Sequence, residues 1–451
     1  MNKAAPNQSL SPRQSVAVGI TLFSMFFGAG NLILPPMLAL QAGTSTVPAM
    51  IGFLVAGIGL PVLGIVAVAL VGTARELADR VHPLFSSIFV AAIYLAIGPC
   101  LAIPRTSSTA FEMLIPLFPQ GAPIGTIRLV FSIAFFAVAY ALAMHPGTLT
   151  KLLGRITGPA LILLLVMVVG SSLVSPAGVA QAPQAPYDSA APIQGFLTGY
   201  QTMDLLASLT FGLVIAETIK ELGVSDSHGL MREISRAGIV AGILMALVYC
   251  GLAQVGASFG SVMPHATNGA ALLTVSATLH FGIAGTVIIA AIYLLACLNV
   301  CIGLISCCGT YFAETFGADA PGAQTHTLGR IPYAGWAVAF TVFSCVVSNV
   351  GLDTILTFSV PLLSALYPVS IVFVIMGMAH RACDRLPLTW PWAIGATTIV
   401  SVATALRDAF FAGIWLPFDA LPLASLGFDW LLPALCGAVV GAILSATRST
   451  K

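Results

Sequence analysis

Charged residues are scarce in this sequence. Only 7% of its 451 residues are Asp, Glu, Lys or Arg, whereas a soluble domain carries about 25%. So little charge cannot cover a water-facing surface, and a hydrophobic content of 58% excludes an intrinsically disordered chain. The net charge of +1 leaves no basic excess for binding nucleic acid. Lipid must therefore be the solvent for most of the chain.

Features of other protein classes are also missing. No P-loop or soluble nucleotide-binding module is present, which excludes ATP-driven transport by this chain alone. The histidines fall in connections or at span ends, and the G-x-S-x-G pattern at Gly256–Gly260 lacks a strand–turn–helix setting. These absences argue against an enzyme, and we expect no organic cofactor. A channel or a receptor is disfavoured, since there is no repeated pore motif and no sizeable soluble domain.

Long uncharged apolar runs fill the sequence instead. No Asp, Glu, Lys or Arg occurs between Arg13 and Arg75 or between Arg236 and Glu314. A membrane helix needs about 20 apolar residues, and the alternation typical of barrel strands is absent. The pattern predicts an all-α membrane protein with twelve transmembrane helices, at residues 15–41, 46–72, 84–110, 127–145, 153–175, 195–219, 236–259, 281–315, 332–350, 353–379, 390–412 and 427–447.

The distribution of basic residues predicts the orientation of these spans. With the N-terminus inside, all but Arg105, Arg128 and Arg407 of the 17 Lys and Arg residues lie on the cytoplasmic side. This is the bias that the positive-inside rule describes. The first apolar segment lacks the short apolar region and cleavage site of a signal peptide. We therefore expect an integral membrane protein with both termini cytoplasmic.

Two spans contain residues that disfavour a regular helix at membrane depth. The first span has Gly28, Gly30 and Asn31 at its centre, and the sixth has the polar segment 204–212. Lipid cannot satisfy the backbone groups that such breaks leave unpaired, so breaks survive only where they line a cavity or bind something. The start of a half-helix suits a carboxylate, and its carbonyl end suits a small cation.

The positions of the two breaks suggest an inverted repeat. Five spans separate their starts, so the two helices run in opposite directions, as in the discontinuous helices of secondary transporters. The predicted halves are residues 15–175 and 195–380, which an extracytoplasmic loop at 176–194 connects. A cytoplasmic segment at 1–14 precedes them, and two accessory helices lie within 381–451. Glycine pairs such as Gly195–Gly199 and Gly437–Gly441 predict close helix packing.

Four ordered motifs resemble those of the bacterial branched-chain amino-acid:cation symporters. They are FSMFFGAGNLILPPMLALQAG (residues 23–43), IGPCLAIPR (97–105), GYQTMDLLASLTFGLVI (199–215) and LACLNVCIGLISC (295–307). The resemblance covers nearly the whole chain. It implies the leucine-transporter type of five-plus-five inverted repeat, with helices one and six broken. It also implies import of leucine, isoleucine and valine, driven by sodium or by protons.

The resemblance further implies a substrate site between the two breaks. The substrate carboxylate would meet the backbone of Ala29, Gly30 and Asn31. Its ammonium group would meet carbonyls around Phe27, Leu205 and Ser208, and Phe211 would wall the pocket for the aliphatic side chain. One methylene is worth about 1–3 kcal/mol in such a pocket, so the three amino acids should share one carrier.

The sodium site of this fold is where the sequence departs from the family pattern. Ser24 and Phe27 would offer carbonyl ligands, but Asn299 and Val300 stand where the eighth span usually has two hydroxyl residues. Asn299 still has an amide oxygen, whereas Val300 offers none. Sodium coupling through a reshaped site, proton coupling and uncoupled transport of a neutral amino acid therefore all stay open.

Two charged residues inside spans have alternative interpretations. Asp204 is a substrate-ammonium or proton site in one interpretation, and a hydrogen-bonded structural carboxylate in the other. Arg105 can be interpreted as a gate or the partner of an acid, or instead as a structural or snorkelling residue. A charged Asp at the bilayer centre costs about 2.5–3.5 kcal/mol on insertion scales, so it should face a cavity or a partner. The oligomeric state is open.

Overall fold

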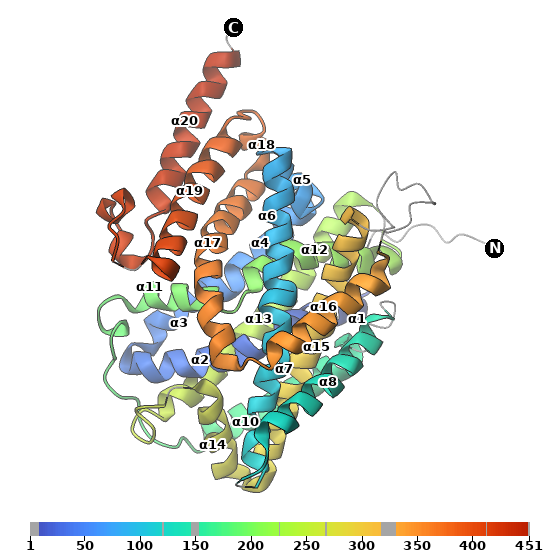
Figure 1. Cartoon of the computed structure of the whole chain (residues 1–451), viewed down its shortest axis with the longest axis vertical. Helices are drawn as coiled ribbons and strands as arrows, with labels where there is room; N and C mark the ends of the chain where they lie inside the picture. The colour runs from blue at the N-terminus through green and yellow to red at the C-terminus, as the bar shows by residue number, and fades with distance from the viewer. Residues whose placement is uncertain are drawn as a thin grey trace, which may run out of the picture.

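The protein is all-helical throughout the part that the computed structural model describes, which comprises residues 9–119, 121–145, 153–224, 226–266, 268–316, 331–411 and 413–449 (Figure 1). The first half contains α1 Pro12–Phe26, α2 Ala29–Ala42, α3 Thr46–Leu54, α4 Leu60–Val71, α5 Ala74–Asp79, α6 Pro83–Leu95, α7 Ala102–Glu112, α8 Ile124–Ala143 and α10 Gly158–Val174. The second contains α11 Tyr187–Tyr200, α12 Asp204–Glu221, α13 Ser227–Ser258, α14 Gly269–Phe281, α15 Ile283–Phe316, α16 Tyr333–Ser348, α17 Leu352–Met378, α18 His380–Cys383, α19 Thr389–Phe410 and α20 Leu431–Ser449.

Short irregular turns join several of these helices. Single π-helical turns at Val55–Gly59, Ala96–Cys100 and Leu153–Thr157 connect α3 to α4, precede α7 and lead into α10. Such π-turns are frequent at functional sites. The turn at Ala96–Cys100 contains Gly98 with ψ −124°, which is not helical, so the third span is interrupted as well.

Nine helical stretches among the described residues are long and apolar enough to cross a membrane, or ten if the bent pair α11–α12 forms one span. The stretch Ala29–Val71 counts once although two spans were predicted there, because α2, α3 and α4 follow one another without a gap. Helix α16 is apolar but short. The number twelve therefore stays a prediction. Helix α14 occupies a region that the sequence pattern assigned to a connection.

Close helix packing through glycine is confirmed within the bundle. A Cβ on Gly195 of α11 would lie 1.8 Å from the Ala49 carbonyl oxygen of α3. A Cβ on Gly437 or Gly441 of α20 would lie 2.5 Å from a carbonyl oxygen of Trp392 or Leu388, at the start of α19. Only glycine allows these backbones to approach so closely. The predicted glycine pairs thus fix two helix–helix contacts inside one chain.

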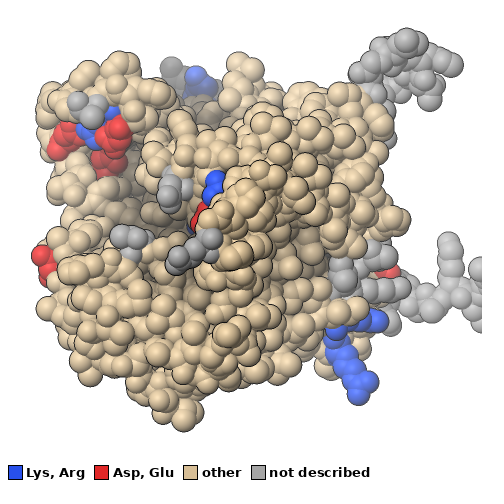
Figure 2. Space-filling view, turned by 60° about the horizontal axis from the view of Figure 1, so that its bottom comes forward, with Lys and Arg blue, Asp and Glu red and all other residues tan. Residues whose placement is uncertain are grey.

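The bundle places the two break regions at its centre. Helix α13 packs against α1, α2 and α4, and α12 packs against α4, while α15 packs against α7. Helices α19 and α20 lie together beside α17 at one corner of the molecule (Figure 1). The face shown in Figure 2 is mostly uncharged, with acidic and basic groups in a few small areas. All nine cysteines are unpaired.

Candidate functional site

The first break separates α1 from α2 at Phe27 and Gly28. Phe27 caps α1 by donating its N–H to the Phe23 carbonyl at 2.8 Å, and Gly28 then takes an extended conformation. The Gly28 N–H donates to Asn31 Oδ1 at 3.2 Å, which fixes the start of α2. The first amides of a helix have no partner within it. Ala29, Gly30 and Asn31 therefore bring unpaired N–H groups and the positive end of the helix dipole to this point.

The second break lies at Gln201–Met203, directly before the polar segment that predicted it. Met203 has φ +66°, a left-handed conformation, and α11 and α12 meet at a bend of 48°. Helix α12 then runs without interruption from Asp204 to Glu221. Leu205 and Ser208 consequently sit in regular helix, and the Ser208 hydroxyl donates to the Leu205 carbonyl at 2.6 Å. The bend thus precedes the segment 204–212 that was predicted to be irregular, and that segment is helical.

A buried polar cluster joins the two breaks. The Asn31 side-chain amide donates to Asp204 Oδ2 at 2.7 Å and also to the Tyr249 hydroxyl. That hydroxyl in turn lies 3.3 Å from Asp204 Oδ2, to which it donates. All three side chains are at most 2% exposed. Tyr249, on α13, was missed by the sequence analysis; its phenol in mid-span was the one available signal, since a buried Tyr hydroxyl usually has a partner.

Arg105 contacts both breaks from α7. Its Nη1 donates to the Gln201 carbonyl at 3.0 Å, and its Nη2 would be 2.9 Å from a Cβ on Gly30. The side chain is 4% exposed and its Nε has no partner within the described structure. Within the described structure, Arg105 and Asp204 do not form an ion pair with each other. The two charges thus remain separate groups.

Both charges line one small cavity. Its volume is about 40 Å³, enough for about three water molecules at about 10–15 Å³ each. The break residues that line it are Gly28, Ala29, Gly30, Asn31, Thr202, Met203 and Asp204. The remaining lining is Met25, Phe26, Ile97, Ala102, Arg105, Thr106, Ala207, Phe211, Val300 and Leu304. A cationic end, an anionic end and an apolar wall therefore face the same space.

The structure places the predicted substrate residues in two groups. Ala29, Gly30, Asn31 and Phe211 line the cavity, and so do both charged candidates, Asp204 and Arg105. The remaining three are buried beside it: the Phe27 ring stacks on Phe23 and lies near Tyr249, and Leu205 and Ser208 lie in α12. The Ser208 hydroxyl is turned toward α4, where it would lie 2.1 Å from a Cβ on Gly64.

The candidate cation ligands do not line this cavity themselves, but their neighbours in the chain, Met25, Gly28 and Val300, do. The Ser24 hydroxyl donates weakly to the Leu153 carbonyl, at 3.4 Å. Asn299 on α15 is 1% exposed, and neither its Oδ1 nor its Nδ2 has a partner within the described structure. A buried amide without partners is unusual and fits an oxygen ligand for a hard cation. Its neighbour Val300 presents a methyl group 3.0 Å from the Cβ position of Gly28.

Comparison with known proteins shows the family of this chain. The chain matches the family described as Branched-chain amino acid transport protein over residues 11–448. It is 35% identical to the branched-chain amino acid permease BraB of Bacillus subtilis, over 97% of this chain and 96% of the relative. It is 35% identical to the branched-chain amino acid transport system 2 carrier protein of Pseudomonas aeruginosa, over 95% of each chain.

Solved structures support the fold alone. MhsT in complex with L-phenylalanine superposes with a TM-score of 0.55 at 16% identity, covering 98% of this chain and 100% of that one. The Eremococcus coleocola manganese transporter gives a TM-score of 0.56 at 13% identity, covering 99% of each chain. The sequence relatives are named permeases and carriers, and not enzymes, as the sequence analysis expected. This integral membrane protein belongs to the branched-chain amino acid transport protein family.

Proposed function

We propose that this protein imports leucine, isoleucine and valine by cation-coupled symport through alternating access. The observation that carries the proposal is the small central cavity, where the start of α2, Arg105, Asp204 and an apolar wall meet. An α-amino acid has one anionic end, one cationic end and a side chain. The lining matches these three parts in chemistry, and the cavity of about 40 Å³ must widen to admit them. The membership of the branched-chain family supports the choice of an aliphatic side chain.

The carboxylate of the substrate would bind at the start of α2. The unpaired N–H groups of Ala29, Gly30 and Asn31 and the helix dipole attract an anion there. Arg105 adds a guanidinium group on the same side of the cavity, within reach of Gly30. An arginine at this point can form two parallel hydrogen bonds with a carboxylate, so it adds direction as well as charge.

The ammonium group would bind Asp204. Asn31 and Tyr249 hold one carboxylate oxygen of Asp204 in place, so its position is fixed before the substrate arrives. The Phe27 carbonyl at the end of α1 is a further proposed contact. Contacts with the carbonyls of Leu205 and Ser208 would require the first turn of α12 to open, because Ser208 donates to the Leu205 carbonyl in the closed helix.

The aliphatic side chain would occupy the apolar part of the cavity. Phe211, Phe26 and Leu304 are among its lining residues. A dry wall of this kind distinguishes side chains by about 1–3 kcal/mol per methylene. Leucine, isoleucine and valine should therefore compete for one site, with affinities that differ by no more than this, whereas a charged side chain would lose its hydration without gaining a partner.

Sodium is the coupling ion that the adjacent residues suit, with protons as the alternative. The unpartnered Asn299 amide and the carbonyls of Ser24 and Phe27 supply oxygen ligands, which small hard cations prefer. Proton coupling would instead use Asp204. The two possibilities differ in the gradient that drives uptake, so they are separable by experiment.

Arg105 is positioned to act in the alternation itself. In the proposed motion, spans one, two, six and seven rock against spans three, four, eight and nine. Arg105 belongs to the second set, while its contacts Gly30 and Gln201 belong to the first. A hollow of about 290 Å³ is lined by Gln201 itself, with Tyr200 and Asp429. Breaking the contact between Arg105 and Gln201 would open the cavity toward this hollow, which the basic-residue bias places outside.

The test is leucine uptake into proteoliposomes with the sodium and proton gradients imposed separately. Uptake driven by sodium alone would support the site around Asn299. Uptake driven by the proton gradient alone would indicate that Asp204 carries the coupling proton. The pH profile of uptake should then change in Asp204→Asn. Uptake with neither gradient would indicate an uncoupled carrier. Absence of leucine, isoleucine and valine transport, with uptake of another neutral amino acid, would refute the substrate assignment.

A further inference from the structure

A groove opens at the end of the bundle that carries the N-terminus of α1. It lies between the start of α13 and the junction of α17 with α18, and it has a volume of about 780 Å³. Helix α4 packs against both α13 and α17, and its Leu70 lines the groove from between them. None of the residues that line this groove lines the central cavity, and the proposed transport mechanism does not use the groove.

The polar lining of this groove is basic. Arg232 and Arg236 come from α13, Arg381 comes from α18, and His228 and His380 lie beside them. Arg236 and Arg232 contact the buried carboxylate of Glu233 at 2.8 and 3.5 Å. Ser15 of α1 donates to the same carboxylate at 2.7 Å. Two of the three guanidinium groups, those of Arg232 and Arg236, therefore contact the Glu233 carboxylate, which is itself buried and does not line the groove.

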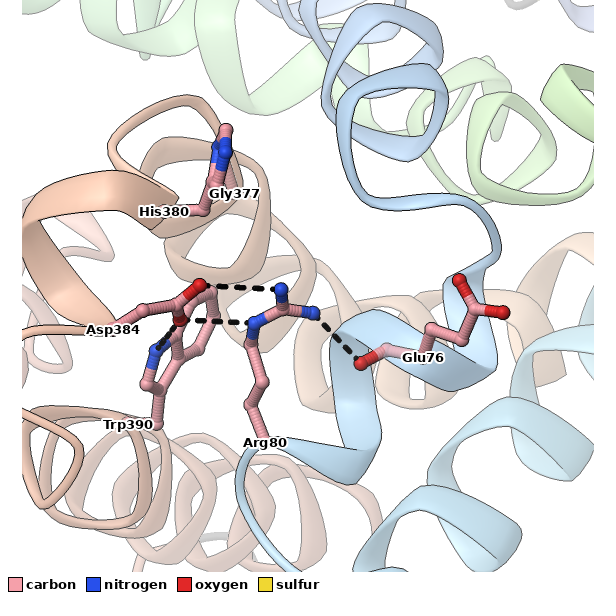
Figure 3. A network of polar contacts seen from close by, with 6 residues as sticks. All are labelled: Glu76, Arg80, Gly377, His380, Asp384 and Trp390. Carbon is pink, nitrogen blue, oxygen red and sulfur yellow. Dashed lines mark hydrogen bonds and ion pairs between the residues drawn. The ribbon is translucent and has the colours of Figure 1, made fainter. Parts of the chain in front are cut away.

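The carboxylate of Asp384, three residues after Arg381, is already paired with Arg80, outside the groove lining. Asp384 accepts two hydrogen bonds from Arg80, at 3.0 and 3.2 Å, and a third from the Trp390 indole at 3.1 Å (Figure 3). The Arg80 hydrogen bonds hold the pKa of Asp384 below its usual value, so it stays ionised and committed to this network. In the part of the chain that the structure describes, Arg381 has no ion-pair partner.

The groove is also apolar, and this is what selects the ligand class. Leu70, Met231, Ile239 and Met378 line it together with the basic residues. Ile239 is 55% exposed and Met378 is 39% exposed, on the α13 and α17 helices that continue into the bilayer. A free phosphate would use the arginines and leave these side chains in water. A phospholipid would use both, with its phosphodiester on the arginines and its acyl chains along Ile239 and Met378.

We propose that this groove binds the head group of an anionic phospholipid. Basic pockets between membrane helices on the cytoplasmic side attract such head groups, with each nearby Arg worth about 1 kcal/mol. The positive-inside bias places the groove on that side. One bound lipid contacts α13 and α17–α18 at once, and it therefore stabilises the packing of these helices around α4.

The test uses the full chain and phosphatidylglycerol as the probe. Native mass spectrometry of the purified protein, titrated with phosphatidylglycerol or phosphatidylcholine, should show preferential retention of phosphatidylglycerol. Arg381→Gln should weaken that retention by about fivefold, the effect of one charge. Arg381→Lys should keep most of it. Arg385→Gln is the matched control, because Arg385 is an exposed arginine next to the same short helix but does not line the groove.

A second measurement makes the outcome decisive. Binding to the folded state raises the melting temperature, so phosphatidylglycerol should stabilise the wild type and the Arg385 variant more than Arg381→Gln. Equal losses in both variants would mean that only the general positive surface attracts lipid, and would overturn the proposal. Equal protection by soluble glycerol phosphate would also overturn it, because the acyl contacts would then contribute nothing. Leucine uptake in phosphatidylcholine vesicles checks that each variant is folded.

Discussion

Bulk at Gly30 is the perturbation that tests the substrate site most directly. A Cβ at this position would lie 2.9 Å from Arg105 Nη2 and 3.4 Å from the Gln201 carbonyl oxygen. In Gly30→Ala the contact falls on the flexible tip of an arginine, which can move by a few tenths of an ångström. In Gly30→Leu four carbon atoms must enter a cavity of only about 40 Å³, against Arg105 and the Gln201 carbonyl.

These contacts set the expected magnitudes. Overpacking costs about 1–3 kcal/mol, which corresponds to a factor of about 5 to 150 in an equilibrium constant. Gly30→Ala should sit at the lower end, with a leucine KM raised by up to about fivefold. Gly30→Leu should exceed the upper end, because it also blocks the approach of the carboxylate to the α2 amides, and uptake should fall below detection.

The assay is the initial rate of radiolabelled leucine uptake into proteoliposomes, normalised to the amount of folded protein. Gly170→Leu is the matched control, since a Cβ at Gly170 in α10 meets no heavy atom within 4 Å. It should transport like the wild type. Normal uptake by Gly30→Leu, at normal protein levels, would refute the placement of the carboxylate at the start of α2.

Three other contacts can be tested in the same way. Tyr249→Phe removes a hydroxyl that donates to the Asp204 carboxylate, a bond worth about 1.5–3 kcal/mol, so the leucine KM should rise at least about tenfold. Tyr293→Phe is the control: the Tyr293 hydroxyl has no partner in the described structure, so its removal should leave KM unchanged. Val300→Ser restores a hydroxyl beside the first break and should lower the half-saturating sodium concentration, whereas Val300→Ala should not; an equal effect of both would exclude a ligand role. The pKa of Asp384 is lowered, so its pairing with Arg80 stabilises the fold at pH values above the usual pKa of 3.8, and this stability is lost as the pH falls through the lowered pKa. Arg80→Gln should therefore lower the melting temperature at neutral pH, and the difference from the wild type should shrink in acid. A difference that does not depend on pH would contradict this.

The sequence alone determined the solvent, the secondary structure class and the first break. With 7% charged residues, only burial in lipid is possible, and in lipid a backbone that is not in a barrel must be helical. Glycines around Asn31 at mid-span marked the break between α1 and α2, because lipid penalises unpaired amides there. Local composition carries all of this information, so no knowledge of distant contacts was required.

The tertiary structure alone decided how the site is assembled. Tyr249 reaches Asn31 from 218 positions away, and Arg105 reaches Gln201 across 96. No local pattern specifies such partners, because they depend on how the helices pack. The same holds for the second break. Met203 has a left-handed conformation, which a non-glycine residue rarely adopts unless the surrounding structure imposes it. Its residue type therefore could not predict that the break lies directly before Asp204.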